Sequence, residues 1–121
     1  QIAHMAQSLK TKIAKQGGVA MLISEVSVPN NDALKTLCFQ LRNETPALYT
    51  VLTAIVDEKP LVHVALSDDL VAKGHNAKNI VNELAKEIQG GGGGQAFYAS
   101  AGGKNKSGLT SVLAKAKTMI A

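Results

Sequence analysis

The stretch YTVLTAIVDEKPLVHVAL (residues 49–66) decides the fold of this chain. Both of its ends are rich in apolar and β-branched residues, which favour pleated, half-buried or buried strands. The polar segment between them, Asp57-Glu58-Lys59-Pro60, contains the residue types that make turns. We therefore predict a β-hairpin formed by residues 49–56 and 61–66.

The region before the hairpin predicts a helix followed by a strand. Gly17-Gly18 would end the helix, because glycine is the usual residue just past a helix C-terminus. Residues 19–26 are mostly apolar and are bounded by Pro29, which predicts a strand. The helix is predicted from apolar residues that recur at helical spacing: Ile2, Met5, Leu9 and Ile13.

A second helix is predicted between this strand and the hairpin. Asn31 or Asp32 would cap its N-terminus, and the helix should stop before Pro46, since the residue before a proline avoids the helical region. Its apolar stripe consists of Leu34, Leu37, Cys38 and Leu41.

Two more helices are predicted after the hairpin. Asn76 would cap the first and Ser107 the second. The apolar stripe of the first consists of Ala77, Ile80, Val81, Leu84, Ala85 and Ile88, and that of the second of Leu109, Val112, Leu113, Ala116 and Ile120. The element order helix, strand, helix, hairpin, helix, loop, helix predicts an α/β fold, with a mixed sheet of about four strands covered by helices.

Length and composition limit the classes of protein that this chain can represent. Its 121 residues, 45% of them apolar and 18% charged, fit a single folded domain over residues 1–121. No apolar stretch approaches the roughly 18 residues that cross a membrane, and no secretion signal is visible. The single cysteine, Cys38, excludes an internal disulfide and fits the cytoplasm. Because the chain begins with Gln1, we expect a piece of a longer protein.

The net charge of +4 is unevenly distributed along the chain. Acidic and basic groups cancel over residues 1–89, whereas residues 90–121 contain four lysines and no acid: Lys104, Lys106, Lys115 and Lys117. Such asymmetry points to an anionic partner, although a solvated helix face would look the same.

Residues 90–108 form a glycine-rich segment that begins with five consecutive glycines. A linker between two domains is excluded, because the remnant after Gly94 is too short to fold alone. Each glycine costs about 0.5–1 kcal/mol relative to alanine, so we expect function rather than packing to require this run. The spacing fits neither a P-loop nor a dinucleotide fingerprint.

A nucleic-acid backbone is the remaining common polyanion. Glycines let backbone N–H groups converge on phosphate, and Gly102-Gly103 stands just before a predicted helix N-terminus, which favours anions. Lys104 and Lys106 would add positive charge there.

The run Gly90-Gly91-Gly92-Gly93-Gly94-Gln95, with the later Ala99-Ser100-Ala101-Gly102-Gly103-Lys104, resembles the C-terminal signature of the alanine–tRNA ligases. That domain is of the DHHA1 type, and the resemblance extends over the whole chain, most strongly over residues 76–104. It implies a non-catalytic domain that contacts the elbow of alanine tRNA and supports aminoacylation and editing. It implies no cofactor here; ATP, Mg and an editing-site Zn would belong to other domains of a cytoplasmic parent enzyme.

The resemblance and the residues together give a set of candidate nucleic-acid contacts. Gln95 departs from the family pattern, in which an arginine often follows the glycines. Alternation on a strand would turn one of the two aromatic neighbours inward, and we assign Phe97 to the core and Tyr98 to RNA, although both could simply pack. The candidates are Gly90, Gly91, Gly92, Gly93, Gly94, Gln95, Tyr98, Gly102, Gly103, Lys104 and Lys106.

Candidate catalytic or metal-binding residues are scattered. His4, His63 and His75 share no metal-ligand spacing with one another or with Cys38. Asp68-Asp69 is more typical of a turn and helix cap than of a metal site. We therefore expect no catalytic site in this chain.

Two other functions remain open. The first is the DHHA1 domain of a DHH-type phosphoesterase, whose partner would be a short single strand. The second is a dimerisation module, in which the apolar stripe of the N-terminal helix pairs with a second copy.

Overall fold

The computed structural model describes residues 2–120, which contain one mixed sheet of six strands. The sheet order is β1-β2-β3-β4-β6-β5; β2 and β3 are parallel and the other neighbours antiparallel. The mixed sheet is confirmed, but two short strands, β1 and β5, were not predicted. The bounds are β1 Ala14–Gln16, β2 Val19–Glu25, β3 Leu48–Val56, β4 Lys59–Leu66, β5 Gly91–Gly94 and β6 Tyr98–Gly102.

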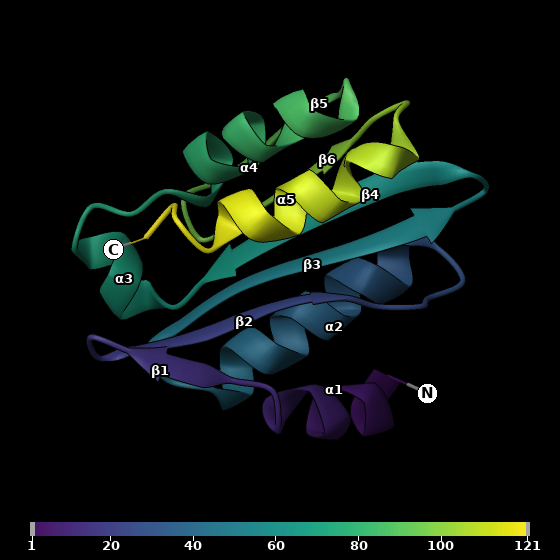
Figure 1. Ribbon diagram of the computed structural model, residues 1–121. Coiled ribbons are helices and arrows are strands. Elements are labelled where there is room, and N and C mark those ends of the chain that lie inside the picture. The colour runs from purple at the N-terminus through teal and green to yellow at the C-terminus, as the bar shows by residue number, and fades with distance from the viewer. Residues whose placement is uncertain (1, 121) are drawn as a thin grey trace.

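Helices cover both faces of this sheet (Figure 1). One face packs against α1 (Ile2–Lys10) and α2 (Asn31–Glu44). The other packs against α3 (Asp68–Ala72), α4 (Ala77–Ala85) and α5 (Leu109–Ala116), with the 3-10 turns η1 (Lys86–Ile88) and η2 (Lys106–Gly108) beside them. None of the helices within residues 2–120 is long and apolar enough to cross a membrane.

Side-chain alternation along the strands builds a separate core on each face. On β3, for example, Val51 belongs to the core under α4 and α5, whereas its neighbour Leu52 belongs to the core under α1 and α2. Both side chains are fully buried. Because β3 lies in the middle of the sheet, its apolar run is continuous rather than alternating.

The predicted hairpin is confirmed, with a tighter turn than expected. Val56 pairs with Lys59, so that only Asp57 and Glu58 form the turn, both at positive φ (51° and 67°). Two-residue turns with positive φ match the twist of the flanking strands. Lys59 and Pro60 therefore belong to β4 and not to the turn.

Two predicted helix boundaries near the N-terminus are wrong. The first helix ends at Lys10, and Gly17-Gly18, at φ 55° and 83°, forms the turn between β1 and β2. The cap of α2 is Asn30, whose Oδ1 accepts a hydrogen bond from the Ala33 N–H (2.8 Å), rather than Asn31 or Asp32. Both errors arise because a local signal was assigned to the wrong neighbouring element.

The capping predictions after the hairpin have mixed outcomes. Asn76 caps α4, accepting a hydrogen bond from the Asn79 N–H (3.2 Å), as predicted. Ser107 does not cap α5: it lies in η2 and its hydroxyl donates to Oδ1 of Asn105 (2.6 Å), while Gly108 occupies the cap position. The last helix therefore starts later than expected.

Candidate nucleic-acid interface

The glycine run is an edge strand and not the predicted loop. Residues 91–94 form β5, which pairs antiparallel with β6 so that Gly91 lies opposite Gly102 and Gly93 opposite Ser100. Glycine is a poor strand former, so the pairing depends on β6 and not on local propensity. The outer edge of β5 has no further strand partner within residues 2–120.

Packing explains only some of these glycines. A Cβ on Gly90 would lie 2.1 Å from the Gly102 carbonyl oxygen, and one on Gly92 would lie 2.1 Å from that of Ser100. A Cβ on Gly94 would likewise be too close, at 2.5 Å from the Tyr98 oxygen. By contrast, a Cβ on Gly91 or Gly93 would meet no heavy atom within 4 Å. We expected that packing would not require glycine in this run, and that expectation is wrong for Gly90, Gly92 and Gly94. Packing does not explain why Gly91 and Gly93 are glycines.

Gly91 lines an open hollow on the sheet, and Gly93 lies on the same sheet face beside Ser100. The strand register places Gly91 beside Gly102 and Gly102 beside Leu61, so these residues share the sheet face that carries α2. The hollow has a volume of about 510 Å³. Its lining consists of Lys59, Leu61, Gln89, Gly90, Gly91, Gly102, Gly103 and Lys104. We refer to it below as the glycine surface.

The glycine surface includes residues that the sequence analysis missed. Lys59 and Leu61 precede the glycine run by about thirty positions and reach it only because β4 pairs with β6, with Leu61 opposite Gly102. The hairpin sequence alone does not predict this proximity, because β4 and β6 are far apart in the chain and pair only in the folded sheet.

The four C-terminal lysines do not form one cluster. Lys104 is exposed at the glycine surface and has no ion-pair partner among residues 2–120. Lys106 is paired with Glu58, and its hydrogen bond lowers the pKa of that carboxyl group. Lys115 binds the Glu87 carboxylate (3.2 Å), and Lys117 lines a different hollow beside β1 and β2.

Four of the backbone N–H groups expected to converge on phosphate already donate hydrogen bonds within the fold. The N–H of Gly103 donates to the Pro60 oxygen (3.2 Å), and that of Lys104 donates to the Ile88 oxygen (2.9 Å). The N–H of Gly90 donates to the Ala85 oxygen (3.0 Å) and that of Gln95 to the Tyr98 oxygen (2.8 Å). The predicted cradle of convergent N–H groups is therefore wrong at these positions, and side-chain charge with an open backbone surface remains.

Tyr98 and Phe97 occupy different environments from those expected. Tyr98 is half-buried and its hydroxyl donates to Nδ1 of the fully buried His63 (2.7 Å), whose Nε2 in turn donates to Oδ1 of Asn31 (2.9 Å). Phe97 is also half-buried, so its assignment to the core is wrong; its ring lies 6.3 Å from that of Phe39. Phe97 precedes the first residue of β6, so strand alternation does not govern it.

No group of three His, Cys, Asp or Glu residues that could hold a metal ion occurs within residues 2–120.

The candidate catalytic side chains are individually unreactive or already hydrogen-bonded. Burial, with a smaller contribution from Lys35, lowers the pKa of His63 to about 4 and keeps the imidazole neutral. Burial also raises the pKa of Cys38, which disfavours the reactive thiolate. Asp69 lies in the first turn of α3 and accepts a hydrogen bond from the Ser67 hydroxyl (2.5 Å).

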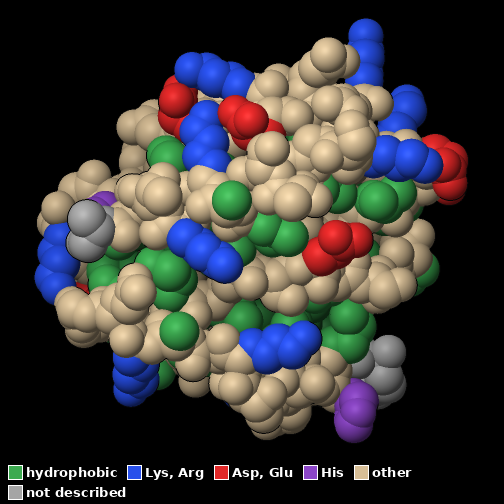
Figure 2. All heavy atoms as spheres, viewed as in Figure 1, with side chains coloured by type: hydrophobic (Ala, Val, Ile, Leu, Met, Phe, Trp, Pro, Cys, Tyr) green, Lys and Arg blue, Asp and Glu red, His purple; other side chains and the backbone are tan. Residues whose placement is uncertain are grey.

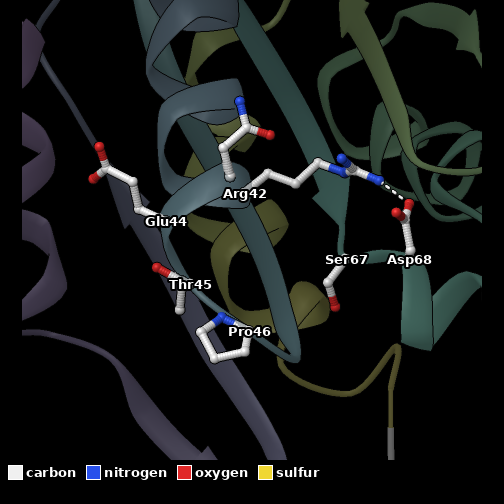
Figure 3. A pocket seen from close by; sticks show the side chains of 7 residues that line it. Arg42, Glu44, Thr45, Pro46, Ser67 and Asp68 are labelled. Carbon is white, nitrogen blue, oxygen red and sulfur yellow. Dashed lines mark hydrogen bonds and ion pairs between the residues drawn. The ribbon is translucent and has the colours of Figure 1, made fainter.

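The hollow beside β1 and β2 also carries two lysines without an ion-pair partner among residues 2–120, Lys12 and Lys117, but no glycine lines it. On the face that carries α4 and α5, lysine and acidic side chains are interspersed (Figure 2). A hollow of about 370 Å³ at the end of α2 contains the ion pair between Arg42 and Asp68, which point toward each other across it (Figure 3). The charges of that pair are thus already neutralised.

Comparison with known proteins finds one matching domain family and several similar relatives. The family model described as the DHHA1 domain matches residues 18–121. An alanine–tRNA ligase of Cytophaga hutchinsonii is 45% identical over 96% of the chain, and one of Bacteroides thetaiotaomicron is 49% identical over 93%. The chain spans 13% of the length of each of these two relatives.

Solved structures share the fold. The C-Ala domain of alanyl-tRNA synthetase from Aquifex aeolicus superposes with a TM-score of 0.80 at 22% identity, covering 89% of this chain and 96% of that one. A DHH-domain protein, described as a member of a family of ribosomal proteins, superposes with a TM-score of 0.57 at 13% identity. It covers 97% of this chain and 30% of that protein.

Proposed function

Because this chain belongs to the DHHA1 domain family, with alanine–tRNA ligases among its relatives, we propose that it is the non-catalytic C-terminal domain of such a ligase and binds alanine tRNA at the elbow. The 45% identity to one ligase over 96% of the chain supports the parent enzyme. The glycine surface supports the location of the RNA contact.

The observation that carries the RNA contact is an open backbone surface beside unpaired lysines. Gly91 and Gly93 have space where side chains would be tolerated, yet they carry none, and Gly91 and Lys104 line the same hollow. Removing Cβ atoms lets a large polyanion approach the backbone closely, and lysine ammonium groups neutralise phosphates. Gly102, Gly103 and Gln95 would extend this contact along the edge of the sheet.

The proposed role is to hold tRNA while other domains carry out the chemistry. A few phosphate contacts give weak binding alone, but tethering to other tRNA-binding domains raises the effective concentration. Aminoacylation and editing would thus share one bound tRNA. ATP, Mg and an editing-site Zn would be bound by those other domains in the cytoplasm.

The dimerisation alternative has less support. The apolar stripe proposed to pair with a second copy already packs inside this chain: Leu9 is buried in the core beneath α1 and α2, and Ile2, Met5 and Ile13 are partly buried against the same core. That packing accounts for the apolar periodicity without a second copy of the chain.

Electrophoretic competition tests the proposal against the phosphoesterase alternative. We expect the 121-residue chain to bind an alanine tRNA transcript more tightly than a single-stranded RNA of the same length. Lys104→Gln should weaken tRNA binding about threefold or more, because one phosphate contact is lost. Lys12→Gln is the matched control, since Lys12 is exposed at a hollow beside β1, the opposite edge of the sheet. Preference for the single strand would instead support a phosphoesterase domain.

A further inference from the structure

Three of the four aromatic residues of the chain gather on the sheet face that carries the glycine surface. The ring centroids of Phe39 and Tyr98 are 4.8 Å apart, and those of Phe39 and Phe97 are 6.3 Å apart. All three side chains are half-buried and thus retain accessible surface. They come from α2 and from the start of β6, which are distant in sequence.

Two cations accompany these rings. Nζ of Lys35 lies 6.0 Å from the centre of the Phe39 ring and 5.7 Å from that of Tyr98. Cζ of Arg42 lies 5.1 Å from the centre of the Phe97 ring. Lys35, Phe39 and Arg42 are spaced along α2 so that they share one side of the helix. We call the five residues the aromatic platform.

Arg42 is held by hydrogen bonds and an ion pair, whereas Lys35 has no ion-pair partner among residues 2–120. Nε of Arg42 donates to the Leu66 carbonyl (2.7 Å) and the guanidinium pairs with Asp68, so Arg42 is fixed in place (Figure 3). Lys35 is exposed and has no ion-pair partner among residues 2–120. Its ammonium group can therefore move toward a ligand.

The aromatic platform and the glycine surface are neighbours along one strand. Tyr98, Ser100 and Gly102 alternate along β6 on the same face, and four residues of strand span about 13 Å. Ser100 is small and only partly covered, so no large side chain of β6 separates the two regions. One RNA segment is long enough to touch both.

We propose that the aromatic platform binds one unpaired nucleobase of an RNA whose backbone lies on the glycine surface; this inference rests on the proposed function. Aromatic rings and guanidinium planes stack on unpaired bases, and lysines beside them bind the adjoining phosphate. Phe39 and Phe97 provide the stacking surface and Lys35 the phosphate contact. Tyr98 is a positioning residue, because its hydroxyl is held by His63.

Paired substitutions separate stacking from charge. We expect Phe39→Leu to weaken binding of alanine tRNA about tenfold without changing the dependence of affinity on salt, since stacking releases no counterions. Lys35→Gln should weaken binding less and make the slope of log affinity against log salt shallower by about one. Lys12→Gln again serves as the control. Lys35 is exposed, so its replacement tests the site even if Phe39→Leu destabilises the fold, which thermal unfolding would reveal.

Photo-crosslinking locates the contact independently. Trypsin cleaves after Lys35 and Arg42, releasing residues 36–42 with Phe39 as their only aromatic residue. Alanine tRNA containing 4-thiouridine should crosslink to this peptide and to residues 87–104, which hold the glycine run together with Phe97 and Tyr98; residues 36–42 therefore report on the aromatic platform alone. Unchanged affinity of both variants, with crosslinks only to residues 87–104, would overturn the platform and leave the proposed function standing. Absence of tRNA binding by the unsubstituted chain would overturn both.

Discussion

His63 shows how one buried polar residue connects three elements. It lies on β4, accepts a hydrogen bond from Tyr98 on β6 and donates one to Asn31 at the start of α2. Both ring nitrogens are satisfied only in the neutral form with the proton on Nε2, because Asn31 offers an acceptor and Tyr98 a donor. Full burial of the ring makes protonation costly.

This environment predicts a loss of stability in acid. The pKa of His63 is lowered from 6.5 to about 4 in the folded chain, so between these values the unfolded state takes up a proton that the folded state does not. The contribution of His63 to the free energy of unfolding is therefore complete above pH 6.5 and falls as the pH drops toward 4, by about 3 kcal/mol in total. Urea unfolding followed by circular dichroism at several pH values would measure it.

His63→Gln is the control for that measurement. Glutamine can donate and accept hydrogen bonds but does not titrate, so the difference in unfolding free energy between the two proteins should shrink as the pH falls through this window. A difference that stays constant between neutral pH and the acid end of this window would show that His63 does not carry the acid sensitivity.

At the scale of elements, β5 is the least predictable part of the chain. Consecutive glycines indicate a flexible loop when read locally, since glycine has no strand preference. The pairing with β6 overrides that tendency, and the close approach of the two strands then requires glycine at alternate positions. The same element thus contains structural glycines and glycines that leave the surface open.

Alanine substitutions should distinguish these two kinds of glycine. Gly92→Ala places a Cβ 2.1 Å from the Ser100 oxygen and should reduce the free energy of unfolding by about 1–3 kcal/mol. Gly93→Ala meets nothing within 4 Å, and its φ is not in the left-handed region, so stability should be unchanged or slightly higher. Thermal or urea unfolding of both variants checks this.

A substitution at a glycine whose Cβ would meet no neighbouring atom tests whether RNA contacts this surface. If RNA lies against the glycine surface, Gly91→Val should weaken tRNA binding while leaving the fold intact, because Gly91 lines the hollow and a larger side chain there would occupy the contact. Equal stability of Gly92→Ala and Gly93→Ala would contradict the close approach of β5 to β6.

At the scale of the whole molecule, the position of a charge matters more than the total. Lys59 and Lys104 meet at the glycine surface because β4 pairs with β6, whereas Lys12 and Lys117 meet at another hollow beside β2. Removing either pair changes the net charge by the same amount. Only the first pair should touch RNA.

Salt titrations compare the two pairs directly. With Lys35, Lys59 and Lys104 in contact with phosphates, tRNA affinity should fall about fortyfold between about 50 and 200 mM salt. The double variant Lys59→Gln, Lys104→Gln should make the slope of log affinity against log salt shallower by about two, and Lys12→Gln, Lys117→Gln should leave it unchanged. Equal effects of the two double variants would indicate non-specific attraction instead of a defined contact surface.

The sequence by itself determined the elements whose signals are local and strong. The β3–β4 hairpin, the apolar stripe of α2 and the Asn76 cap of α4 follow from residue type and spacing within a few positions. The glycine motif was also sufficient to indicate the family, because a rare local pattern needs no knowledge of the fold.

Only the tertiary structure decided which residues share a surface. It made β1 and β5 into strands, paired Lys106 with Glu58, brought Lys59 to the glycines and gathered Phe39 with Phe97. The reason is physical: strand pairing and ring contacts form between segments far apart in the chain, and their register depends on burying both cores at once. The local pattern of residue types therefore does not indicate which distant segments will become neighbours.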